Sequence, residues 1–415
     1  MYEQITLPNG VRVLIERIPN LRSAALGVWV ASGSRQESAA QNGAAHFIEH
    51  MVFKGTHSQS AAQLAERMDA IGGHVNAFTT KECTCFYARA LDSHLPEALD
   101  LLCSMLFDSA FRQEDVETER GVILEEIGMY RDTPDDLCSE RLAAAIYKGT
   151  PLARPILGTP STLSKMTGDW LREYMAGHYL PGDMVVSLAG SFDDSVVEEI
   201  KARFSHLKGG ALPKPKAVSY KPAFTTKKKA IEQNHLILAF PSIPTGSPKR
   251  FAAQLLSSIL GGGMSSRLFQ EVREKRGLCY SVYSYGASYA ETGSFAVYTA
   301  LGRETERQAL ETICAVVREF AAQGVTQAEL DRAREQSKAG VLMGLESTTA
   351  HMNHMARSVL SGNEILTPDE IIAAYDSVTR EDVRALAGEI FDFGRVSLSA
   401  VGRVAPEEEY RDMVQ

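Results

Sequence analysis

The sequence predicts an α+β protein of two homologous domains of about 200 residues, each an antiparallel-rich sheet packed with helices. The chain of 415 residues is too long for one ordinary hydrophobic core. Residues 207–225 are rich in glycine, proline and lysine and lack periodicity, as expected of a linker. The same order of elements occurs on both sides of this segment, which indicates a duplication. We therefore predict an N-terminal domain over 1–206 and a C-terminal domain over 226–415.

The first domain is predicted to open with a β-hairpin, because two apolar segments flank the turn signal Pro8-Asn9-Gly10. An apolar run at 24–34 indicates a buried strand. After it the spacing of apolar residues changes to that of helices and then returns to that of strands. The remaining predicted elements are helices at 44–53 and 58–72, strands at 74–80 and 82–91, helices over about 93–148, a further helix, and a strand at 184–190.

The second domain is predicted to repeat this order. It begins with a strand and two helices, continues with two paired strands, and ends with long helices and a closing strand. The segments are 235–240, 250–262, 266–277, 279–289, 293–301, about 304–390, and 396–402.

The composition is that of an ordinary globular protein and argues against several functional classes. A net charge of −9 disfavours a nucleic-acid-binding protein, which usually carries a basic face. No apolar run approaches the roughly 18–20 residues of a membrane helix, and the N-terminus lacks the features of a signal peptide. The six cysteines are spread thinly, as the reduced thiols of cytosolic proteins are. We therefore expect a cytoplasmic protein that binds neither nucleic acid nor membrane.

The most informative motif is the H-x-x-E-H pentad at 46–50, the inverted form of the H-E-x-x-H zinc motif. On a helix, His46 and His50 share a face, so both imidazoles can reach one metal ion. Glu49 would then lie beside the metal, where a bound water sits. The alternative is a helix with two partly buried histidines and a surface glutamate. The apolar neighbours Phe47 and Ile48 argue against it, because an uncompensated glutamate is costly in such surroundings.

A catalytic zinc needs about three protein ligands and one open position for water. The third ligand should come from another element, and the helical segment 117–132 supplies candidate carboxylates. Glu119 and Glu126 are seven residues apart and lie on one helix face, whereas Glu125 points roughly 100° away from Glu126. A ligand carboxylate at Glu126 and a supporting carboxylate at Glu119 would fit this arrangement.

Residues 43–56, GAAHFIEHMVFKGT, resemble the signature of the family of pitrilysin, insulin-degrading enzyme and mitochondrial processing peptidase. The segments LPNGVRVL, VNAFTTKE and ERGVILEEI resemble it too, and 261–282 is the C-terminal counterpart. The resemblance covers nearly the whole chain, and the spacing from His50 to Glu126 fits the processing-peptidase branch. It implies an inverzincin whose two domains form half of a clamshell.

The resemblance implies a metal-centre role for five residues. His46, His50 and Glu126 would hold one Zn²⁺ per chain. Glu49 would deprotonate the zinc-bound water, and Glu119 would orient a histidine. The implied activity is that of a zinc-dependent endopeptidase, which hydrolyses extended or unfolded peptides within an enclosed chamber.

Four further residues match substrate-binding positions of the family. Asn76 and Ala77 fall on the edge strand that pairs with an extended substrate, and Arg273 and Tyr280 match a pair that contacts the substrate backbone. In single-chain relatives this pair and the zinc lie in different halves. This chain is only one half yet carries both, so we expect a homodimer in which each site is completed in trans by the partner's Arg273 and the partner's Tyr280.

Two alternatives remain open. One is a catalytically silent structural or assembly subunit, as in the respiratory-complex core proteins of this family, which the intact pentad disfavours. The other is an active subunit of a heterodimeric processing peptidase.

Overall fold

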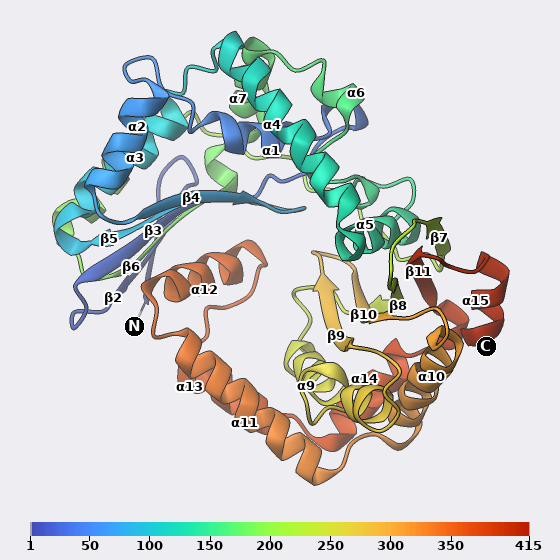
Figure 1. The fold of residues 1–415 in the computed structure, drawn as a ribbon. Coiled ribbons are helices and arrows are strands. Elements are labelled where there is room, and N and C mark those ends of the chain that lie inside the picture. Colours follow the sequence, from blue (N-terminus) through green and yellow to red (C-terminus); the bar gives the residue numbers. More distant parts are fainter. Residues whose placement is uncertain (1, 415) are drawn as a thin grey trace. The chain divides into compact units, whose positions relative to one another are not determined.

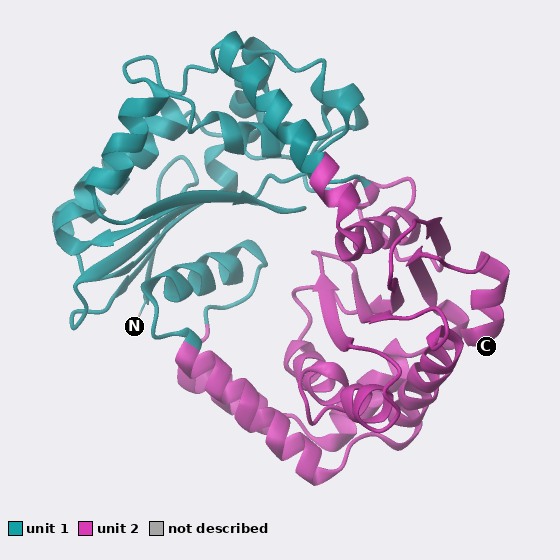
Figure 2. Cartoon of the chain, viewed as in Figure 1, with its two compact units in different colours: residues 1–127, 154–216, 344–365 teal, residues 128–153, 217–343, 366–415 magenta. Residues whose placement is uncertain are grey.

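The computed structural model describes residues 2–414, which form two compact units. Unit 1 contains residues up to 127 together with 154–216 and 344–365, and unit 2 contains 128–153, 217–343 and the residues from 366 onward (Figure 2). Each unit combines one sheet with surrounding helices (Figure 1). The predicted α+β class with two sheet-and-helix domains is therefore confirmed.

Unit 1 has a six-stranded sheet with the order β1-β2-β6-β3-β5-β4. The predicted hairpin forms from β1 and β2, and the parallel pair of β2 and β6 is the exception in an otherwise antiparallel sheet. Strand β4 lies at one edge. The bounds are β1 Tyr2–Thr6, β2 Arg12–Arg17, β3 Ser23–Val30, β4 His74–Thr79, β5 Thr84–Leu91 and β6 Met184–Gly190.

Unit 2 repeats this topology in a five-stranded sheet with the order β7-β11-β8-β10-β9. Taken in this order, the strands correspond to β2, β6, β3, β5 and β4 of unit 1. The pair of β7 and β11 is again the parallel one. The sheets therefore share one connectivity, as a duplication requires. The bounds are β7 Phe224–Lys228, β8 Asn234–Ser242, β9 Ser281–Ser288, β10 Gly293–Leu301 and β11 Ser397–Gly402.

The helices follow the predicted order, although the long helical regions divide into several helices. In unit 1 they are α1 Ala44–Met51, α2 Ala61–Ala70, α3 Leu95–Phe107, most of α4 Gln113–Asp132, α6 Pro160–Leu163, α7 Gly168–His178, α8 Asp194–Ser205 and α12 Thr348–Leu360. In unit 2 they are α5 Pro134–Ile146, α9 Arg250–Gly261, a π-helix at Phe269–Glu274, α10 Glu306–Gln323, nearly all of α11 Gln327–Gly344, α13 Pro368–Ser377, α14 Arg380–Ile390 and α15 Glu407–Val414.

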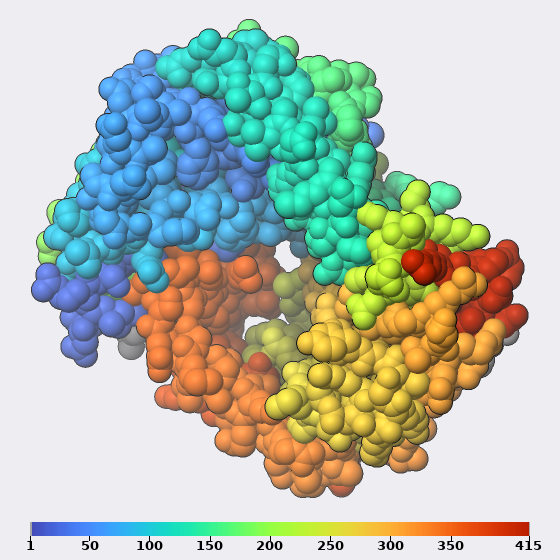
Figure 3. Space-filling model, in the orientation of Figure 1, coloured from blue at the N-terminus to red at the C-terminus, as the bar shows by residue number. Residues whose placement is uncertain are grey.

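Helix α12 belongs to unit 1 although it lies in the C-terminal half of the chain. Its buried Met352 and Met355 pack with Trp29 on the sheet face opposite to α2 and α3 (Figure 1). Gly27 permits this approach, because a Cβ there would lie 2.6 Å from Met352 Sδ. In the space-filling view, orange residues of this segment lie beside the blue N-terminal strands (Figure 3).

Helix α5 makes the reciprocal exchange. It lies in the N-terminal half of the chain, but its buried Cys138, Leu142 and Ile146 pack with Ile237 and Val401 of the unit 2 sheet. The predicted domains, 1–206 and 226–415, are each one continuous stretch of chain, whereas each unit of the structure is built from three separate stretches. An amphipathic pattern shows that a helix has an apolar face, but not which of two similar sheets will cover it.

The predicted linker, 207–225, lies where the chain passes from one unit to the other. It contains the boundary between the units at 216 and 217, but its last two residues already belong to strand β7. In the short segment Phe224–Lys228, buried and exposed residues do not alternate as in a typical half-buried strand. Its first three residues are partly buried and its last two are exposed. Within residues 2–414, no helix is both long and apolar enough to cross a membrane.

Candidate metal centre

Helix α1 places the two histidines of the pentad on one face. Their ring centroids are 4.6 Å apart, as expected for positions i and i+4. The helix begins after Gly43, whose φ is 99° and whose Cβ, if present, would lie 2.8 Å from Gly158 Cα. Only glycine fits both conditions. Buried residues on the remaining faces, among them Phe47, Ile48 and Met51, anchor the helix in unit 1.

Helix α4 supplies the third side chain. Glu126 Oε2 lies 3.6 Å from Nε2 of His46 and 3.6 Å from Nε2 of His50. Tetrahedral ligands about 2.1 Å from a zinc ion are roughly 3.4 Å apart, so this spacing fits a metal. Within residues 2–414, His46, His50 and Glu126 are the one group of three metal-ligating side chains with ligand atoms within 4.8 Å of one another.

A buried carboxylate fixes the orientation of the second histidine. Glu119 is 3% exposed, and its Oε2 lies 3.1 Å from Nδ1 of His50. Its Oε1 lies 2.5 Å from Nζ of Lys54, which donates to it. This contact holds Nδ1 of His50 against Glu119 and leaves Nε2 on the side of Glu126. Burial lowers the pKa of His50, but the hydrogen bonds with Glu126 and Glu119 outweigh it and raise the pKa. Glu125 is exposed and takes no part.

Lys54 is a site residue that the sequence interpretation missed. It lies four residues after His50, within the segment 43–56 that carried the family resemblance, and that spacing was the available signal. Residues beyond the end of α1 cannot be assigned to a face from periodicity alone, so its contact with Glu119 required the structure.

The charges at the centre suit metal binding and proton transfer. Burial, together with the neighbouring His50, lowers the pKa of His46 to about 4, so this imidazole is neutral and free to act as a ligand. Burial also raises the pKa of Glu49, and polar groups of Thr79 partly oppose the increase. Oε2 of Glu49 is buried and makes no hydrogen bond. A carboxylate with a raised pKa and a free oxygen can accept a proton.

Strand β4 lies in contact with α1 and forms one of the two edges of its sheet (Figure 1). Asn76 and Ala77 face Tyr87 and Phe86 on β5, so the other edge of their backbone is unpaired within the sheet. Asn76 is exposed, while Ala77 is buried. The predicted edge strand is therefore an edge strand in the structure.

Arg273 and Tyr280 lie together in unit 2. The Arg273 guanidinium is 5.3 Å from the ring centroid of Tyr280 and 4.6 Å from that of Phe269. Tyr280 is 74% exposed, just before strand β9. The stacked guanidinium and the exposed phenol form one surface feature, in which both side chains retain hydrogen-bond donors.

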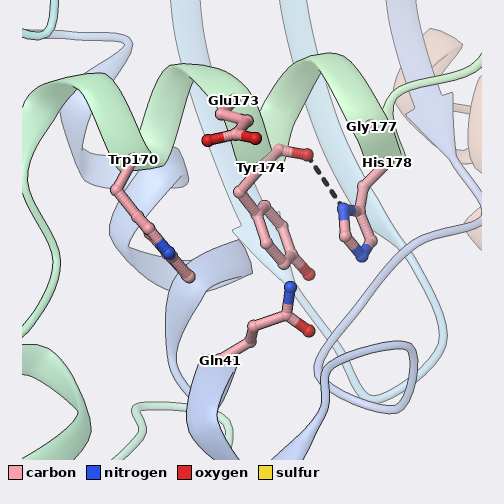
Figure 4. Close-up of a pocket in the computed structure, with 6 residues that line it drawn as sticks. All are labelled: Gln41, Trp170, Glu173, Tyr174, Gly177 and His178. Atoms are coloured by element: carbon pink, nitrogen blue, oxygen red, sulfur yellow. Dashed lines mark hydrogen bonds between the residues drawn. The ribbon is translucent and has the colours of Figure 1, made fainter.

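A separate cavity of about 270 Å³ lies along α7 in unit 1. Its lining contains none of the predicted site residues, and His178 Nδ1 in its wall donates to the Tyr174 carbonyl at 2.9 Å (Figure 4). The lining residues are Gln41, Trp170, Glu173, Tyr174, Gly177 and His178.

Comparisons with known proteins assign the two parts of the chain to one family. Residues 12–160 match the model described as Insulinase (Peptidase family M16), and residues 165–337 match Peptidase M16 inactive domain. The metal-ligating group and Glu49 all lie in the first match, and the second match contains none of them.

Similar proteins extend over nearly the full length. The uncharacterized zinc protease YmxG of Bacillus subtilis is 42% identical, over 97% of this chain and 100% of its own length. The uncharacterized zinc protease SCO5738 of Streptomyces coelicolor is 41% identical, over 98% of this chain and 90% of its own. A solved structure from Pseudomonas fluorescens, titled as a peptidase M16 inactive domain, has a TM-score of 0.91 at 24% identity and covers 98% of this chain and 99% of its own. A protease from Helicobacter pylori has a TM-score of 0.88 at 21% identity, over 97% of this chain and 99% of its own.

Proposed function

This chain belongs to peptidase family M16, and from that premise we propose that it is a zinc-dependent endopeptidase that hydrolyses extended or unfolded peptides. The observation that carries the proposal is the convergence of His46, His50 and Glu126 within 4.8 Å, with Glu49 on the same short helix. The word inactive in the second family description applies to residues 165–337, which lie outside this group.

The donor set fits zinc, since two imidazoles and a carboxylate leave one coordination position open. A bound Zn²⁺ would act as a Lewis acid and would lower the pKa of water. Glu49 takes a proton from the attacking water and passes it to the leaving amine. Glu119, held by Lys54, keeps His50 in the tautomer that binds metal.

The free edge of β4 supports binding of an extended peptide as an added strand. Backbone hydrogen bonds would then provide most of the affinity, so we expect broad sequence preference. The six free cysteines are consistent with the cytoplasmic location that we propose.

The function is tested on the purified chain by its metal content and its hydrolysis of a random peptide library. We expect about one zinc per chain, cleavage that stops on chelation, and resistance of stably folded proteins, because we propose that the site lies within an enclosed chamber. If the protein binds one zinc per chain but neither the monomer nor any oligomer hydrolyses peptides, the silent-subunit alternative would be favoured. Rapid digestion of a rigid native protein would contradict an enclosed site.

We also propose that the active assembly is a homodimer, the commonest symmetric oligomer. The chain carries both the metal-ligating group and the exposed pair of Arg273 and Tyr280, and the family resemblance places such a pair opposite the zinc of another half. Each site would then use the partner's Arg273 and the partner's Tyr280.

Mixing two inactive variants tests this arrangement. One chain carries Glu49→Gln, and the other carries Arg273→Ala with Tyr280→Phe. A mixed dimer has one complete site if the pair acts in trans, so subunit exchange should restore up to about half of the wild-type activity per heterodimer. Inactive heterodimers of confirmed composition would show that the pair acts within its own chain. Gel filtration of the pure, active chain separates a homodimer from a requirement for a different partner.

A further inference from the structure

Helix α1 needs support at its N-terminus. It has eight residues, and a helix of two turns is unstable by itself. The first N–H groups of a helix have no partner within it. The N-cap residue of α1 is Gly43, which has no side chain to accept from them. The stability of α1 therefore depends on an acceptor from another segment.

The carboxylate of Glu37 is that acceptor. Glu37 is 2% exposed and precedes the helix by seven residues. Its Oε1 accepts from the backbone N–H of Ala45 at 2.9 Å, and its Oε2 accepts from the N–H of Gly43 at 2.9 Å. Nδ2 of Asn42 donates to the same Oε2 at 3.0 Å. The positive end of the helix dipole favours a negative charge at this place.

Neighbouring groups hold Glu37 in this position. Arg154 donates to the backbone carbonyl of Glu37, and its charge favours the ionised carboxyl. Burial raises the pKa of Glu37 to about 7, and the hydrogen bonds from Ala45, Asn42 and Gly43 oppose the increase. Asn42 Nδ2 also donates to the carbonyl of Pro155 at 2.8 Å, which ties the start of the helix to a second loop.

We propose that Glu37 is a positioning residue of the metal centre, an inference that rests on the proposed zinc-dependent function. The backbone N–H that Glu37 holds belongs to Ala45, the residue directly before His46. Glu37 thereby fixes the rotation and axial position of a two-turn helix that carries His46, Glu49 and His50. A small rotation of this helix would move the two Nε2 atoms away from their common distance of 3.6 Å to Glu126. The carboxylate thus acts on the metal through the backbone and touches neither metal nor substrate.

The test is Glu37→Gln, which keeps the shape of the side chain but replaces one oxygen with an NH₂ group. That group must face a backbone N–H or the Asn42 amide, so at least one hydrogen bond is lost. The matched control is Glu173→Gln, the same change at an exposed residue of α7 in the same unit. Both variants are compared with the wild type for thermal stability, for zinc affinity by chelator competition, and for the visible spectrum of the Co²⁺-loaded protein.

We expect Glu37→Gln to weaken zinc binding about 10- to 100-fold, the usual effect of losing a group that orients a ligand, and to alter the Co²⁺ spectrum. Glu173→Gln should match the wild type. Wild-type affinity and spectrum in Glu37→Gln, whatever its melting temperature, would overturn the inference while leaving the proposed function intact.

A second variant covers the case in which Glu37→Gln does not fold. Asn42→Ala removes the hydrogen bonds from Nδ2 to Glu37 and to the Pro155 carbonyl and leaves the carboxylate in place, so it should weaken zinc binding in the same direction but less. An unchanged affinity in Asn42→Ala, with Glu37→Gln unfolded, would overturn the inference. A wild-type chain that binds no zinc would overturn the proposed function, and this inference with it.

Discussion

Replacement of Glu49 by glutamine is expected to lower peptide turnover by about two to four orders of magnitude, the usual contribution of a general base. The amide keeps the shape of the side chain but cannot accept the proton of water. Glu49 is not one of the three side chains that converge on the metal position, so the variant should keep its zinc and still bind peptides. Measurement of kcat, of zinc content and of peptide affinity on one preparation separates these effects.

The matched control is Glu125→Gln, a change at an exposed carboxylate on α4 that is not one of the three converging side chains. It should retain wild-type turnover. Near-normal turnover in Glu49→Gln would exclude Glu49 as the base. A loss of zinc in that variant would instead show that Glu49 is a ligand.

The second large effect is expected from the ligands themselves. Replacement of His46, His50 or Glu126 by alanine should each abolish tight zinc binding, because only two of the three converging groups remain. The loss should exceed the roughly 10- to 100-fold that outer partners of a ligand contribute. Zinc content after dialysis against a weak chelator measures it, and Glu125→Ala is the control.

Full zinc occupancy in Glu126→Ala would show that another carboxylate binds the metal. Glu119 is poorly placed for that role, because His50 and Lys54 occupy its two oxygens. The three single variants at His46, His50 and Glu126 therefore distinguish the proposed ligand set from one in which another carboxylate of α4 replaces Glu126.

Much of the metal centre follows from sequence because its residues obey local periodicity. The positions 46 and 50 on α1, and 119 and 126 on α4, are each fixed by the geometry of one helix. The order of the other strands along the chain also follows the predicted repeat, since each of them has its own apolar run, whereas β7 at Phe224–Lys228 has none. The roles assigned to these residues stay predictions until the variants above are measured.

Lys54 and Glu37 could not be predicted in this way. Both reach their partners across turns, where no period relates sequence distance to direction. The helices α5 and α12 present a similar difficulty. Their apolar faces are visible in sequence, but the sheet that each one covers is a long-range choice between two sheets of the same topology.

That exchange has a consequence for synthesis on the ribosome. The unit 1 sheet is complete in sequence once Gly190 has emerged, yet its face around Trp29 stays uncovered until α12 follows at residues 348–360. At ordinary elongation rates this delay is on the order of ten seconds. Helix α5, by contrast, is synthesised before the unit 2 strands against which it packs, so its apolar face stays exposed until they follow. The nascent chain therefore cannot fold one unit before the next begins, and it carries an exposed apolar sheet face that a chaperone can recognise until most of the protein has been translated.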